Sequence, residues 1–300
     1  MEEWLEHLEE FNNYLLLERG LSPHSVEAYV RDAAKLYEFA DLKSLDKKPT
    51  EIIEPDILDF LQYLTELGLA APSQARMLSG VKAFYKFLDL QNLLVSNPTE
   101  LIEAPKISRH LPDVLNYPEI VQILEAFDLS TPEGTRNRAI LEVLYSSGLR
   151  VSELTDLQLT NCHFEGGFLQ VVGKGSKMRL VPIGQDAIKH TQLYVQHIRS
   201  GLDVQKGSED IVFLNRRGKQ LTRVMIFLVI KDIAAKANIH KTVSPHTFRH
   251  SFATHLIEGG ADLRAVQEML GHESITTTEV YTHLDREYLR HVVAKYHPRS

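Results

Sequence analysis

Residues 168–183 read FLQVVGKGSKMRLVPI and contain two short β-type runs joined by a glycine-bearing turn. The runs at 168–172 and 179–183 are rich in branched and aromatic residues, which favour strands, and GKGSKM supplies the glycine that a hairpin turn needs. Helical apolar spacing surrounds this hairpin. Helices are predicted at 135–147 and around 185–200, 221–237, 245–258, 262–270, 275–283 and 285–296. The stretch therefore predicts a mixed α+β domain with a small sheet.

The start of this domain is marked by Asn116, which Glu119 follows three residues later in a capping-box pattern. The first third of the chain reads instead as four helices. One covers residues 2–19, and the others open at Ser22, Pro55 and Pro72, with no strand pattern between them. The predicted fold is mainly α with a small β-sheet. A four-helix domain spans residues 1–103, a proline-spaced basic linker 104–115, and the mixed domain 116–300.

Composition places the chain among ordinary globular proteins. Of its 300 residues, 43% are hydrophobic and 24% charged, and there is a single cysteine, Cys162. One cysteine cannot form an intramolecular disulfide, which favours a reducing, cytoplasmic setting. The acidic N-terminus lacks the pattern of a signal peptide. The longest apolar run, residues 224–230, is far shorter than the roughly 20 residues of a membrane span.

Charge is divided unevenly along the chain. Residues 1–110 carry 19 acids and 11 bases, a net −8, whereas residues 111–300 carry 21 acids and 22 bases, a net +1. Eleven of the 14 histidines also lie in the second part. Phosphate binding depends on local basic clusters, so an overall charge of −7 argues against indiscriminate DNA coating but permits a basic cleft.

Chemistry-bearing residues gather in four short segments of the second domain. These are Arg150 in GLRVSEL, Lys174 in GKGSKMR, His246 and Arg249 in SPHTFRH, and His272 and Tyr281 in LGHESITTTEVYTH. Taken singly, each has an ordinary explanation. Arg150 would form a surface ion pair with Glu153, and Lys174 and His272 would be solvated. Tyr281 is one of eleven tyrosines, and Tyr145, Tyr288 and Tyr296 are equal candidates by themselves.

Metal binding is the sharpest rival interpretation. His246 and His250 have the i, i+4 spacing of two ligands in a helical zinc site. The glutamate of such a motif is missing, and Arg249 would repel a metal ion. We expect neither a metal nor a cofactor, and GKGSK lacks the spacing of an ATP-binding loop.

Together the six residues form a set suited to phosphodiester exchange. Two arginines and two histidines can hold a phosphate dianion without metal. Tyrosine is a possible covalent nucleophile, and a lysine can protonate the departing sugar oxygen as a general acid.

At this point the sequence resembles the tyrosine recombinase, or phage integrase, family. The family's G-L-R-x-S-E-L, G-K-G-x-K-x-R, H-x-x-R and L-G-H segments match at Arg150, Lys174, His246 with Arg249, and His272, and its nucleophile matches Tyr281. In the N-terminal part, residues 21–29 and 81–88 also resemble the family's core-binding domain. Length and the closing HPRS are similar to the Xer branch, which resolves chromosome dimers.

The resemblance implies a site-specific recombinase that clamps duplex DNA, independent of metal and ATP. A cyclic tetramer, of this chain or with a related Xer protein, would exchange strands through 3′-phosphotyrosyl bonds and a Holliday junction. It would dock the last helix of each subunit, about residues 285–296, into a neighbour. A septal DNA translocase would activate it. Integration or excision of a mobile element, a non-catalytic DNA-binding protein and a metal hydrolase remain alternatives. The DNA site and its reading residues stay open; candidates for backbone contacts are Arg76, Lys82 and Lys86.

Overall fold

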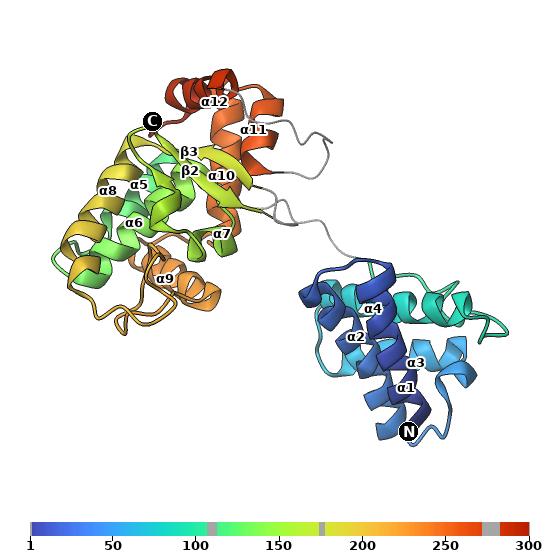
Figure 1. Cartoon of the computed structure of the whole chain (residues 1–300). Coiled ribbons are helices and arrows are strands. Elements are labelled where there is room, and N and C mark those ends of the chain that lie inside the picture. Colours follow the sequence, from blue (N-terminus) through green and yellow to red (C-terminus); the bar gives the residue numbers. More distant parts are fainter. Residues whose placement is uncertain (1, 107–112, 174–177, 272–282, 300) are drawn as a thin grey trace. The chain divides into compact units, whose positions relative to one another are not determined.

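The computed structural model describes residues 2–106, 113–173, 178–271 and 283–299, with side chains from 288 onward in the last range. The chain forms two compact units, residues 1–110 and 111–300 (Figure 1). Each unit has its own apolar core. The predicted combination of a helical N-terminal domain and a mixed domain with a small sheet is confirmed.

The N-terminal unit contains the four predicted helices. They are α1 (Glu2–Asn13), α2 (Pro23–Leu42), α3 (Glu54–Glu66) and α4 (Ala71–Leu90). The side chain of Ser22 accepts a hydrogen bond from the backbone N–H of Ser25, as its capping role requires. Aromatic rings fill the core: Phe84 of α4 stacks on Trp4 and meets Phe11 edge-on, both from α1.

Two of the three cations proposed for DNA backbone contacts have partners inside this unit. Arg76 pairs with the buried carboxylate of Asp32 at 2.9 Å, and Lys82 donates to the carbonyl of Ile102 at 2.6 Å. Lys86 is exposed. Arg76 and Lys82 therefore help to hold the unit together, and contact with DNA stays a prediction for all three.

The second unit surrounds a three-stranded antiparallel sheet in the order β1-β2-β3. In its register Leu169 faces Val181, and Val172 faces Met178. The strands are β1 (Cys162–His163), β2 (Phe168–Val172) and β3 (Met178–Pro182). The helices are α5 (Tyr117–Glu125), α6 (Pro132–Ser147), α7 (Val151–Thr155), α8 (Gln185–His197), α9 (Arg223–Lys236), α10 (Pro245–Gly259), α11 (Leu263–Leu270) and α12 (His283–Tyr296).

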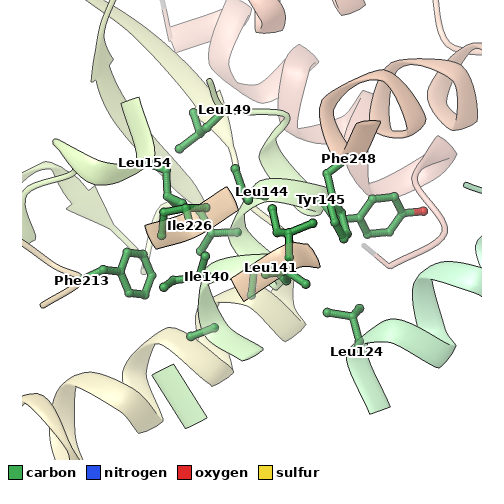
Figure 2. Packing of buried hydrophobic residues seen from close by; sticks show 14 of the residues in the cluster. Leu124, Ile140, Leu141, Leu144, Tyr145, Leu149, Leu154, Phe213, Ile226 and Phe248 are labelled. Carbon is green, nitrogen blue, oxygen red and sulfur yellow. The ribbon is translucent and has the colours of Figure 1, made fainter. Parts of the chain in front are cut away.

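Helix α6 runs through the centre of this unit. Its second half is buried on all sides, with Leu141, Leu144 and Tyr145 among the core residues of Figure 2. The helix ends at Gly148, whose φ of +59° suits glycine. A Cβ atom there would lie 2.5 Å from the ring of Phe252, so a larger residue would also clash. This tight turn leads directly to Arg150.

The structure differs from the sequence-based elements in several places; the helix predicted over residues 2–19, for example, is an α-helix to Asn13 and a π-helix over Tyr14–Glu18. Helix α6 begins at Pro132 rather than Thr135, because Thr131 caps it by accepting from the N–H of Gly134. Strand β1 and helix α7 were not predicted; they have two and five residues, too few to show a periodicity. The predicted helix at 275–283 lies, except for its last residue, outside the described residues. No helix among the described residues is long and apolar enough to cross a membrane.

The end of the chain packs on its own unit. Leu289, Val292 and Val293 of α12 join a core cluster with α10 and α11. Beyond the helix, Arg299 binds the buried carboxylate of Glu142 at 2.8 Å and Asp186 at 2.7 Å. His297 is buried, with its ring centroid 4.7 Å from that of Tyr145.

We expect this buried histidine to make folding sensitive to acid. Burial, followed by the charge of His255, lowers the pKa of His297 from 6.5 to about 3. The unfolded chain binds the proton below pH 6.5 and the folded chain does not. The stability is therefore fully present above pH 6.5 and is lost as pH falls, by about 1.4 kcal/mol per unit.

Urea unfolding at pH 7.5 and 5.5 measures this effect. His297→Phe removes the titrating group. Between pH 7.5 and 5.5, the unfolding free energy of this variant should therefore fall by about 1.4 kcal/mol less than that of the wild-type protein. His190 and His255 also have lowered pKa values and contribute to the acid sensitivity of both proteins. The effect of His297 is therefore the difference between the losses in the wild-type protein and in the variant. Equal losses would contradict the assignment.

Candidate active site

Three arginines from three different elements converge on the C-terminal end of α11. Arg179 of β3 donates its Nε–H to the carbonyl of Met269 at 3.0 Å. Arg249 of α10 donates to the carbonyl of Leu270 at 2.6 Å, and Arg150 to that of Gly271 at 3.0 Å. The last carbonyls of a helix lack partners within it and carry the negative end of its dipole. They are therefore suitable acceptors for cations, and they bring the arginines together.

The buried carboxylate of Glu153 joins two of these arginines. Its Oε1 accepts from Arg150 Nη1 at 2.9 Å and from Arg179 Nη1 at 2.6 Å. Its Oε2 accepts from the backbone N–H of Arg150 and from Arg179 Nη2, both at 2.8 Å. Four donors saturate a carboxylate. Glu153 is therefore an orienting anion rather than a proton acceptor.

The ionisation of Glu153 follows from the same contacts. Burial acts to raise the pKa of this carboxyl, but hydrogen bonds and charge from Arg179, and then hydrogen bonds from Arg150, lower it below its ordinary value. The group is thus an anion at neutral pH. The Glu153 carboxylate fixes the guanidinium of Arg150. The Glu153 side chain is 3% exposed, whereas the Arg150 side chain remains 36% exposed.

The second arginine of the predicted set is held by two helix ends at once. Arg249 Nη1 donates to the carbonyl of Gly148, at the end of α6, at 2.6 Å, and Nη2 reaches the end of α11. Both helix ends have a glycine in the left-handed conformation. Burial, followed by the charge of Arg150, lowers the pKa of Arg249 from 12.5 to about 10. The residue is still a cation at neutral pH.

The charges of this cluster favour an anionic ligand. Arg150, Arg179 and Arg249 contribute three positive charges and Glu153 one negative charge, so the sum is +2. A phosphate passing through a trigonal-bipyramidal state carries two negative charges on its non-bridging oxygens. Arginine binds such oxygens through paired N–H groups, and Arg150 and Arg249 supply them.

His246 lies in the first turn of α10, the helix predicted around residues 245–258. Ser244 accepts from the N–H of Thr247 at 3.3 Å, Pro245 begins the helix, and His246 is exposed one turn before Arg249. The remaining predicted residues, Lys174, His272 and Tyr281, lie outside the described residues. In sequence, His272 directly follows the Gly271 carbonyl that Arg150 binds.

Two members of this cluster were not among the sequence-based candidates. Glu153 was considered only as a surface partner for Arg150; the pair is present, but its carboxylate is buried. Arg179 closes the GKGSKMR segment and was not considered at all. A signal for Glu153 was available, because its spacing of three from Arg150 is that of a capping residue. The family's G-K-G-x-K-x-R segment ends on Arg179, but nothing in that segment showed which residues it contacts, because its partners lie 26 and 90 residues away.

Among the described residues, the fold brings no third ligand to the two histidines of the zinc interpretation. His250 is exposed, like His246, on α10. Within the described part of the chain, no group of three or more histidine, cysteine or acidic residues is placed to hold a metal ion.

Comparison with protein families gives matches to both units. Residues 113–287 match the phage integrase family, and residues 8–92 match the phage integrase N-terminal SAM-like domain. A relative described as tyrosine recombinase XerD from Chlorobaculum tepidum is 46% identical over 302 residues, covering 100% of this chain and 98% of that protein. Another XerD, from Listeria monocytogenes, is 40% identical and covers 98% and 99%.

Solved structures are similar over nearly the whole chain. The XerA recombinase crystal structure is 32% identical, with a TM-score of 0.51, and covers 99% of this chain and 100% of that one. The XerH site-specific recombinase bound to a palindromic difH substrate, in a post-cleavage complex, has a TM-score of 0.71 at 24% identity. It covers 96% of this chain and 84% of that one, and shows similarity of fold alone.

Proposed function

Because the chain belongs to the phage integrase family of tyrosine recombinases, we propose that Tyr281 is its nucleophile and that five residues assist it. The five are Arg150, Lys174, His246, Arg249 and His272. The observation that carries this proposal is the convergence of Arg150 and Arg249 at the end of α11, immediately before His272 in sequence. Two guanidinium groups at one place, each with paired N–H donors, can bind the oxygens of a single phosphate.

The proposed chemistry is a pair of transesterifications. The Tyr281 oxygen attacks the scissile phosphorus, the bond from phosphorus to the 5′ oxygen breaks, and a 3′-phosphotyrosyl bond forms. Lys174 gives a proton to the leaving 5′ oxygen, and a histidine or water takes the phenolic proton. The 5′ hydroxyl of a second duplex then reverses the step. The number of phosphodiester bonds is unchanged, so the exchange needs no ATP.

The arginines and Glu153 are assigned to stabilising the charge that develops at phosphorus. Guanidinium groups that are already in place need no reorganisation during the reaction, which makes their electrostatic contribution large. Arg249 is fixed by two carbonyls and Arg150 by Glu153 and one carbonyl. Each retains further N–H groups for phosphate oxygens, because a guanidinium has five.

Duplex DNA is the partner of this recombinase. Residues 1–103 are assigned to core-site binding, 104–115 to the linker and 116–300 to catalysis. We assign the active form to a cyclic tetramer, in which α12 of one subunit docks on the next. The apolar face of α12, with Leu289, Val292 and Val293, supports this assignment, since a second copy offers the same receiving surface.

For the biological role we propose resolution of chromosome dimers in the cytoplasm, with activation by a DNA translocase at the septum. XerD relatives that match the full chain support this role over a mobile-element integrase. Crosslinking the protein to DNA in its host, followed by sequencing, tests it. We expect one occupied chromosomal site that lies outside any mobile element. Occupancy of the two ends of a mobile element instead would overturn the proposed role.

A further inference from the structure

We propose that Arg179 is a positioning residue for the recombination reaction, one that acts on DNA cleavage through Arg150 without touching the phosphate. The inference rests on the proposed function of Arg150. It starts from a property of the cluster: of the three arginines at the end of α11, Arg179 is the most buried, with a side chain 7% exposed. A group so enclosed is poorly placed to bind DNA.

Within the described residues, each hydrogen bond of the Arg179 side chain leads to another part of the site. Nη1 and Nη2 bind both oxygens of Glu153 in the paired, parallel geometry that suits arginine and carboxylate. Nε binds the carbonyl of Met269, two residues before the Gly271 carbonyl that holds Arg150. Arg179 therefore fixes both anchors of Arg150, namely the carboxylate and the last turn of α11.

Close packing reinforces this arrangement. A Cβ atom on Gly271 would lie 3.1 Å from Cδ and Nε of Arg179, so the glycine allows the guanidinium to lie against the helix end. The φ of Gly271 is +65°, a conformation that also favours glycine. Both features keep the carbonyls of Met269 and Gly271 turned toward arginines.

Charge gives Arg179 a second effect on Arg150. Glu153 is a buried anion that faces two cations, and Arg179 provides both of its own Nη groups to it. Without Arg179, the carboxylate would keep Arg150 as its one described cationic partner. The carboxylate would then compensate the positive charge of Arg150 by itself and draw its guanidinium toward Glu153, away from a phosphate. Arg179 thus leaves the charge of Arg150 available to DNA.

The test is a double-mutant cycle on DNA cleavage. Single-turnover formation of the covalent adduct is measured with saturating nicked duplex that carries the recombination site. We expect Arg179→Met to slow adduct formation about 30-fold while DNA affinity stays within about threefold, which is the effect of raising the barrier by about as much free energy as one hydrogen bond to a charged group contributes. In an Arg150→Ala background, Arg179→Met should slow adduct formation by less than about threefold, because the side chain that Arg179 positions is absent.

Arg199→Met is the matched control. Arg199 is also buried and bonds to carbonyls of Glu209 and Ile211, away from the cluster. Its loss should lower the melting temperature as Arg179→Met does, but leave the cleavage rate of bound protein unchanged. If Arg179→Met does not fold, Arg179→Lys is used. It keeps the charge but not the paired geometry, and should be about tenfold slower with the same dependence on Arg150.

The outcomes are distinct. Equal slowing by Arg179→Met in the two backgrounds, or no slowing, would overturn the positioning role of Arg179. Slowing by Arg199→Met as great as by Arg179→Met would show a general effect of stability and overturn it as well. Failure of the wild-type protein to form any adduct would instead contradict the proposed function itself.

Discussion

Tyr281→Phe is expected to bind the recombination site with unchanged affinity and to form no covalent adduct. The substitution removes one oxygen atom and keeps the ring, so it is the smallest change that takes away the proposed nucleophile. Without that oxygen the phosphotyrosyl bond cannot form. The loss should exceed about 10⁴-fold, the scale seen when a nucleophile is removed from an enzyme. Gel-shift titration measures binding, and a nicked duplex that releases its cleaved fragment traps the adduct.

Other tyrosines provide controls for this experiment. Tyr288 is half exposed on α12, so Tyr288→Phe should leave adduct formation unchanged. Tyr145, an equal candidate by sequence, is unsuited to the role. It is fully buried, its hydroxyl lies 2.8 Å from Nδ1 of His255, and burial raises the pKa of its phenol well above the ordinary value. An adduct on Tyr281→Phe would show that another group attacks DNA.

Arg249→Ala is expected to slow cleavage of bound DNA by about 10³-fold, the upper end of the effect of removing one preorganised donor from a charge-stabilising site. The substitution removes a cation and leaves the carbonyls of Gly148 and Leu270 without the donors that join α6 to α11. Arg249→Lys keeps a charge but cannot bridge both carbonyls, so it should recover only a small part of the rate.

Arg216→Ala is the control for Arg249. Arg216 is 84% exposed and its pairing with Glu133 is long, at 3.5 Å, so its loss should change cleavage less than about twofold. Single-turnover rates at saturating DNA separate cleavage from binding. A rate for Arg249→Ala within tenfold of wild type would contradict the assigned phosphate contact.

Local signals explain which features the sequence predicted well. Caps at Ser22 and Asn116 depend on residues three positions apart, and both form the expected hydrogen bonds. The antiparallel pair β2 and β3 was equally predictable, because in the sequence a glycine-bearing segment joins two runs of strand-forming residues. The family's motifs also singled out Arg150 and Arg249, which converge at the end of α11, whereas the catalytic roles of the six residues stay a prediction.

The remaining features depend on contacts between distant residues. Strand β1 exists because it pairs with β2, and a two-residue strand has no pattern of its own. The burial that converts Glu153 from a surface partner into an orienting anion is set by packing around α7. Arg179 reaches Glu153 and Met269 through the tertiary fold alone.

The most direct test of the central claim is to map the bond between protein and DNA. Adduct formed with a nicked recombination site in excess chelator is digested with trypsin, and the nucleotide-bearing peptide is sequenced by mass spectrometry. We expect a 3′-phosphonucleotide on Tyr281, in the peptide of residues 265–286, and a free 5′ hydroxyl on the released strand. Attachment to another residue, linkage through a 5′ phosphate, or loss of the adduct with chelator would contradict the account.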